Sequence, residues 1–184
     1  IARQTYFKYV GDIRIIAITP TAGPLSGGTR TSITILSTYN IGSSRQVKCH
    51  FGNVSLPAIG VTTLGQSWNV ECLTPAKNIP VSGPVFVDLS INDGNDKTTS
   101  TILYHYRPNP IVASIRPSHG FISGGENIVV RGKNFYKSLH LSCMFGKYPA
   151  TRTLWVSTEE LHCTTPKLRQ EYNASLSVSL SKIT

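Results

Sequence analysis

Four cysteines are the residues whose spacing most clearly predicts chemistry in this chain. They form two pairs, Cys49 with Cys72 and Cys143 with Cys163, separated by 23 and 20 residues. Neither pair has the Cys-x-x-Cys spacing of a zinc or redox site. Each cysteine lies in a run whose apolar residues alternate with polar ones, so each thiol is expected to point into a core. We predict the disulfides Cys49–Cys72 and Cys143–Cys163; the alternative is buried free thiols, which pack as small apolar residues.

The two predicted disulfides have consequences for stability and for location. Each would stabilise its domain by roughly 3 kcal/mol, because it closes a loop in the unfolded chain. Disulfides persist in oxidising compartments, which predicts a location outside the cytosol.

Side chains that could catalyse a reaction or bind a metal are few. Glu159 and Glu160 are adjacent among only nine carboxylates, so on a strand they would face opposite sides. No nucleophile elbow or phosphate-binding loop is present. Residues Asp93–Asp96 have the composition of a calcium loop but lack its downstream glutamate, and Asn92–Asp96 also suit the tight turn of a hairpin. Five histidines lie in expected strands or turns without an unassigned Ser or Cys partner: His50, His105, His119, His140 and His162. We predict no enzyme, no cofactor and no metal site.

The formal net charge of +9 suggests nucleic acid or heparin-like polymers as partners. The basic residues are scattered, however, and form neither a run of five or six nor one face of a helix. We therefore predict a solvated basic surface, with at most weak polyanion contact and no specific nucleic-acid binding.

Two N-glycosylation sequons are present. They are Asn53-Val54-Ser55 and Asn173-Ala174-Ser175, so Asn53 and Asn173 are the predicted glycosylation sites. Sequons of this kind also arise by chance, so they agree with secretion without establishing it.

The elements that position these residues occur twice. Residues Ile18–Gly28 return as Ile115–Gly125, 97 positions later. Two further landmarks recur in the same order: Cys49–Gly52 as Cys143–Gly146, and Cys72–Pro75 as Cys163–Pro166. A period near 95 is too long for a solenoid and predicts two tandem small domains.

The apolar pattern predicts strands throughout. No segment of ten or more residues has a 3.6-residue apolar period, and alternation of period two dominates instead. Examples are Thr31, Ile33, Ile35; Val85, Val87, Leu89, Ile91; Ile102, Tyr104, Tyr106; and Leu176, Val178, Leu180. Short strands separated by Gly- and Pro-rich turns predict an all-β fold of two tandem immunoglobulin-like β-sandwiches.

The repeat also predicts the domain limits. Residues 1–10 match the closing strand of the first full copy and are expected to be the tail of a preceding domain. Residues 11–107 form the first full domain, and 108–184 form the next, truncated at its C-terminus. The boundary falls at Arg107-Pro108-Asn109-Pro110, where two prolines predict a short, stiff joint.

The shared residues resemble a known family. Ile-x-Pro-x-x-Gly-x-x-Ser-Gly-Gly, followed by Cys-x-Phe-Gly, Cys-x-Thr-Pro and a closing Tyr-x-Tyr, resembles the IPT/TIG (immunoglobulin-like, plexin, transcription factor) domain. The resemblance covers nearly the whole chain. Tandem copies with paired cysteines are most similar to the ectodomain stalks of plexins and of the hepatocyte growth factor receptor family, in which these would be the second and third IPT domains. The Gly-Gly pairs and the preceding prolines, Pro20 and Pro117, are expected to be structural: glycine permits the turn and proline ends an edge strand.

The resemblance implies a non-catalytic segment of a cell-surface, semaphorin-receptor-like protein. Such a segment would space and orient a ligand-binding head relative to the membrane on the extracellular side. Its partners would be a semaphorin- or growth-factor-type ligand or the receptor head, together with neighbouring IPT domains. The alternative is a Rel-type transcription factor, whose TIG domains dimerise and contact the DNA backbone. The basic charge favours that alternative, whereas the matching cysteine pairs oppose it.

Overall fold

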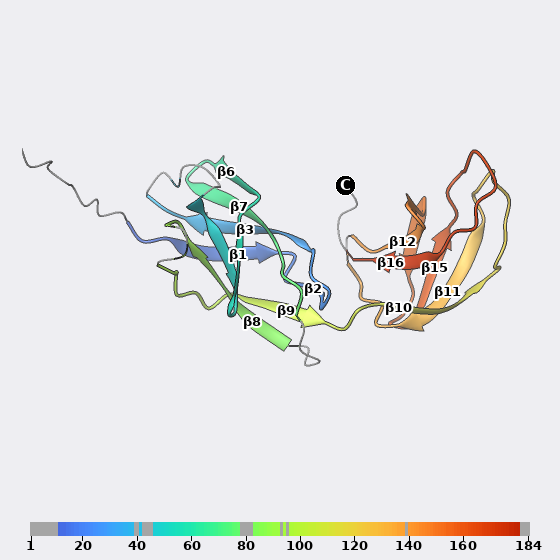
Figure 1. The fold of residues 1–184 in the computed structure, drawn as a ribbon, viewed down its shortest axis with the longest axis horizontal. Coiled ribbons are helices and arrows are strands. Elements are labelled where there is room, and N and C mark those ends of the chain that lie inside the picture. The colour runs from blue at the N-terminus through green and yellow to red at the C-terminus, as the bar shows by residue number, and fades with distance from the viewer. Residues whose placement is uncertain are drawn as a thin grey trace, which may run out of the picture. The chain divides into compact units, whose positions relative to one another are not determined.

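The computed structural model describes residues 11–38, 41, 46–77, 83–92, 94, 96–138 and 140–180. This part of the chain is built of β-strands and contains no α-helix (Figure 1). None of its elements is a helix that could cross a membrane. The predicted all-β fold of tandem immunoglobulin-like sandwiches is confirmed.

The first sandwich consists of two sheets. One has the strand order β1 (Arg14–Thr19), β3 (Arg30–Leu36), β7 (Ser67–Leu73) and β6 (Gly60–Leu64). The other has the order β2 (Ala22–Pro24), β9 (Leu103–Arg107), β8 (Gly83–Ser90), β4 (Lys48–Phe51) and β5 (Val54–Pro57). The short strand β2 pairs in parallel with β9, whereas β4 pairs antiparallel with both β5 and β8.

The second sandwich repeats this arrangement with fewer strands. One sheet has the order β10 (Ile111–Arg116), β11 (Asn127–Lys133), β15 (Glu160–Thr164) and β14 (Arg152–Trp155). The other has the order β13 (Tyr148–Pro149), β12 (Ser142–Phe145) and β16 (Leu176–Ser179). The strands β2 and β9 have no counterpart among the residues described in the second copy.

The backbone repeats in detail as well as in outline. The register of β1 against β3 shifts between Ile15 and Ala17, and that of β10 against β11 shifts between Val112 and Ser114, 97 positions later. Both first strands lie at a sheet edge and end directly before a proline, Pro20 or Pro117. The position of each proline agrees with the expectation from the sequence.

The Gly-Gly pairs occupy a turn that requires glycine. Gly27, Gly28, Gly124 and Gly125 all have positive φ, between 67° and 87°. At Gly124 a side chain would also meet the backbone of Pro166, since an added Cβ would lie 2.6 Å from its carbonyl atoms. These glycines are therefore explained by backbone geometry.

Alternating apolar residues fill each core. In the first sandwich the most deeply buried side chains include Ile33, Val70, Val87 and Leu89, and the ring of Tyr104 packs edge-on against Phe51 with centroids 5.5 Å apart. In the second sandwich Ile128, Val130, Phe135 and Leu161 surround the cysteines. Half-buried Trp155 donates its indole N–H to the carbonyl oxygen of Phe135 at 2.7 Å.

Candidate functional site

Each cysteine pair forms a disulfide that joins the two sheets of one sandwich. Cys49 lies on β4 and Cys72 on β7, with their Cα atoms 6.3 Å apart. Cys143 lies on β12 and Cys163 on β15, at the same Cα separation of 6.3 Å. All four are at most 1% exposed, so both bonds cross the centre of a core. None of the four has a free thiol that could bind a metal or attack a substrate.

One histidine has a serine partner that the sequence did not reveal. The Nε2 atom of His50 lies 3.2 Å from the hydroxyl oxygen of Ser90, on the neighbouring strand β8. Both side chains are 2% exposed, and the Nδ1 atom of His50 has no hydrogen-bond partner. Asp88, opposite His50 on β8, instead accepts hydrogen bonds from Thr98 and Ser100. The statement that no histidine has an available serine partner was therefore wrong for His50, because the pairing depends on strand register.

The His50–Ser90 pair is buried and lacks the orienting group of a catalytic triad. A nucleophilic serine needs access to substrate and a histidine held by a third residue, and this pair has neither. Burial lowers the pKa of His50, and nearby Lys97 lowers it further. Both effects favour the neutral imidazole, which is buried on the face of β4 opposite to Cys49 and Phe51.

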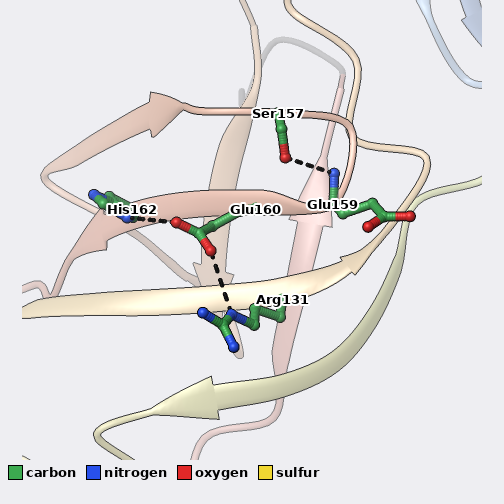
Figure 2. Close-up of polar contacts among 5 residues, drawn as sticks. All are labelled: Arg131, Ser157, Glu159, Glu160 and His162. Carbon is green, nitrogen blue, oxygen red and sulfur yellow. Dashed lines mark hydrogen bonds and ion pairs between the residues drawn. The ribbon is translucent and has the colours of Figure 1, made fainter.

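A polar network lies on the exposed face of the β11–β15 pair (Figure 2). Glu160 accepts from the Nε atom of Arg131 at 3.3 Å, and its other oxygen lies 3.1 Å from Nε2 of His162. Glu159 points away from this network, as expected for adjacent glutamates, and its backbone N–H donates to the Ser157 hydroxyl at 3.1 Å (Figure 2). The hydrogen bond from His162, and then that from Arg131, lowers the pKa of Glu160. Glu160 is therefore an ionised carboxylate, unsuited to act as a general acid near neutral pH.

A shallow hollow of about 160 Å³ lies beside this network. It is lined by Asn127, Arg152, Leu154, His162 and Thr164. The hydroxyl of Thr164 donates to the amide oxygen of Asn127 at 2.8 Å. The lining offers hydrogen-bonding groups and a guanidinium, and it contains no carboxylate.

No metal centre is formed by the residues that the structure describes. No three His, Cys, Asp or Glu side chains among them lie close enough to share an ion. In the turn that contains the calcium-loop candidate Asp93–Asp96, Asn92 donates to the Asp96 carboxylate at 2.7 Å and accepts from the Asp96 N–H at 3.0 Å. These two side chains thus bind each other across the turn; Asp93 and Asn95 lie outside the described residues.

Both predicted glycosylation sites are on the surface. Asn53 lies in the tight turn between β4 and β5, and Asn173 lies in the segment that leads into β16. Both residues are exposed. Their glycosylation stays a prediction.

The fold and the two core disulfides define tandem immunoglobulin-like domains of the IPT/TIG class. The chain matches the IPT/TIG domain family over residues 14–106 and again over 110–184, and it belongs to that family.

Two solved structures of the plexin A4 full extracellular region have a similar fold. The first structure contains domains 1 to 10 and is 21% identical in sequence to this chain, with a TM-score of 0.63. The match covers 86% of this chain and 13% of the plexin chain. The other, with domains 1 to 8, is 21% identical with a TM-score of 0.57, over 92% of this chain and 17% of that one. The chain thus spans a small part of the length of either structure.

Proposed function

We propose that this chain is a non-catalytic segment of an extracellular receptor stalk, in which two IPT domains act as a spacer. The observation that carries the proposal is the disulfide across each core, since two buried disulfides at matching positions are typical of secreted domains. The similarity in fold to the plexin A4 extracellular region supports it. The parent protein would be membrane-anchored, with the chain on the extracellular side.

The spacer role rests on the short connection between the two domains. Strand β9 ends at Arg107 and β10 begins at Ile111, so only three residues separate them. Two of the three are Pro108 and Pro110, whose rings fix φ and keep the preceding residues extended. We place the domain limits at 11–107 and 108–184, with 1–10 as the tail of a preceding domain. A joint with so few free torsions would transmit a rotation of a ligand-binding head.

The proposed partners are proteins. They are a semaphorin- or growth-factor-type ligand, or the head domain of the same receptor, and the IPT domains on either side. The Rel-type alternative is not favoured, because a cytosolic transcription factor has no use for a buried disulfide in each domain.

Two experiments test this proposal. When the chain is secreted from animal cells, its intact mass should be lower than that of the fully reduced chain by the four thiol hydrogens. Reduction after denaturation should restore that mass. Four thiols that react with an alkylating reagent in denaturant without reductant would contradict an extracellular location.

The spacer role is tested by replacing Pro108 and Pro110 together with glycine. The distribution of interdomain distances, measured by small-angle scattering or by two fluorophores, should broaden while both domains stay folded. In a full-length receptor the same change should weaken ligand-driven signalling without changing ligand affinity. Pro57→Gly with Pro84→Gly, at exposed positions within the first sandwich, is the matched control. Unchanged distances and unchanged signalling would refute the spacer role.

A further inference from the structure

The exposed face of the β10–β11–β15–β14 sheet gathers basic side chains from four separate segments. Along β11, Ile128 and Val130 are buried, whereas Asn127, Arg131 and Lys133 are exposed on the opposite face. The strand register places Arg116 opposite Val129, and Val129 opposite His162. Directly opposed residues share a face of the sheet. Arg152 reaches this face from β14, since it lines the same hollow as Asn127 and His162.

We call this surface the basic face and define it by Arg116, Arg131, Lys133, Arg152 and His162. All five residues are exposed. Glu160 is the only carboxylate in the four strands, and it is already bound by Arg131 and His162 (Figure 2). No ion pair joins Arg116, Lys133 or Arg152 to a carboxylate in the described part of the chain. The face therefore carries unbalanced positive charge.

The equivalent face of the first sandwich carries fewer cations, although its fold is the same: Arg14 and Arg30 lie on it, beside Glu71. At the equivalent positions it carries Thr19, Thr34, Leu36 and Glu71 in place of Arg116, Arg131, Lys133 and His162. The fold does not require cations there. The cluster of four strongly basic side chains, Arg116, Arg131, Lys133 and Arg152, is thus a property of the second sandwich alone.

The spacing of these cations suits an extended polyanion. Neighbouring strands lie about 4.8 Å apart, and alternate residues along a strand lie roughly 6.7 Å apart. Guanidinium and ammonium groups on such a lattice can meet anionic groups repeated along a polymer, and guanidinium binds oxyanions through paired hydrogen bonds. Asn127 and Thr164 add hydrogen-bonding groups beside Arg152 in the hollow.

We propose that the basic face of the second sandwich binds a sulfated polysaccharide. The face carries no aromatic side chain, and its large exposed apolar residues are two aliphatic ones, Ile111 opposite Lys133 and Leu154, at 56% and 48% exposure. Protein interfaces depend on buried aromatic and apolar anchors, and single-stranded nucleic acids on aromatic stacking, so an acidic protein or such a nucleic acid fits less well. The choice of a sulfated polysaccharide over duplex DNA rests on the proposed extracellular location.

The test measures heparin binding to the purified chain at physiological salt. The triple variant Arg116→Gln, Lys133→Gln, Arg152→Gln removes three cations and leaves the Arg131–Glu160–His162 network intact. It should weaken binding roughly tenfold or more, and it should reduce the slope of log affinity against log salt by about two to three. Glu160→Gln, which removes the only carboxylate of the face, should strengthen binding.

The matched control removes the same charge elsewhere. Arg14, Lys97 and Lys147, all exposed and all outside the basic face, are replaced with glutamine. This control should bind heparin nearly as tightly as the unmodified chain. Equal weakening by both triple variants would overturn the proposal, since net charge alone would then explain binding.

The source of the anion is tested with other polymers. Desulfated heparin and duplex DNA should bind at least tenfold more weakly than heparin. Equal binding of DNA, equal binding of the desulfated polymer, preference for an acidic protein, or no heparin binding would each refute the proposal. Because the assay uses purified chain, its failure is distinguishable from failure of the extracellular location, which the mass measurement tests.

Discussion

His50 and Ser90 are paired on the face of the β4–β8 strand pair that is turned away from the core disulfide, with Nε2 and Oγ 3.2 Å apart and each residue 2% exposed. Folding buries this imidazole, and burial disfavours its charged form. The contact therefore links the protonation of one side chain to the stability of the first sandwich.

We expect the first sandwich to lose stability as the pH falls below about 6.5. Burial, followed by Lys97 and then Lys48, lowers the pKa of His50 below its ordinary value of 6.5, although Asp88 opposes this. The unfolded chain then binds a proton that the folded chain resists, so the free energy of unfolding falls with pH by up to about 1.4 kcal/mol per unit. Above pH 6.5 both states are neutral at this site and the term disappears.

Urea unfolding at several pH values measures this effect. The chain has one tryptophan in each sandwich, Trp68 and Trp155, so Trp155→Phe leaves fluorescence that reports the first sandwich alone. His50→Gln in that background should remove the part of the pH dependence due to His50. Parallel pH profiles with and without His50 would show that the imidazole is not responsible.

Removal of either disulfide should destabilise only its own sandwich. We expect Cys49→Ala with Cys72→Ala, or Cys143→Ala with Cys163→Ala, to cost about 3 kcal/mol in the affected domain. Each loop spans 23 or 20 residues, so the two losses should be similar. Unfolding followed separately through Trp68 and Trp155 measures both, and a loss that appears equally in the two domains would contradict the assignment.

The fold and the disulfide positions could be predicted because their signals are local. Alternation around Cys49 and Cys72 indicates which way each thiol points, and the second copy repeats the pattern. Alternation also predicts that Tyr104 and Tyr106 are buried, and they are 0% and 3% exposed. Each inference about which way a side chain points uses the alternation within a single strand.

The His50–Ser90 pair and the basic face could not be predicted in the same way. Both depend on the register between strands distant in sequence, which alternation within one strand does not determine. Arg116, Arg131 and Arg152 are scattered along the chain, and a search for charge runs or helical faces does not find them. The one local signal was Arg131 and Lys133 alternating with buried Ile128 and Val130 on a single strand.

Both sequons should carry glycans when the chain is secreted from animal cells. Asn53 and Asn173 are exposed, Asn53 in a hairpin turn, so folded structure does not cover either acceptor. Asn53→Gln and Asn173→Gln should each reduce the mass by one glycan and leave stability within about 0.5 kcal/mol, as for other surface changes. The measurement is intact mass before and after enzymatic deglycosylation, with the double variant as the unglycosylated control. No glycan on either residue would argue against passage through the secretory pathway.

The adjacent glycines Gly124 and Gly125 should respond differently to alanine. Both have positive φ, 67° and 87°, so either change places an L side chain in the left-handed region at a cost of roughly 1–2 kcal/mol. At Gly125 an added Cβ meets no atom within 4 Å, whereas at Gly124 it would lie 2.6 Å from the backbone of Pro166. Gly124→Ala must therefore also move the segment after β15, whose Leu168 N–H donates to the Ile122 carbonyl at 2.8 Å.

Unfolding of the second sandwich, followed by Trp155 fluorescence in a Trp68→Phe background, should show a clearly larger loss of stability for Gly124→Ala than for Gly125→Ala. Equal losses would mean that φ alone explains the Gly-Gly pair and that the contact with Pro166 relaxes freely.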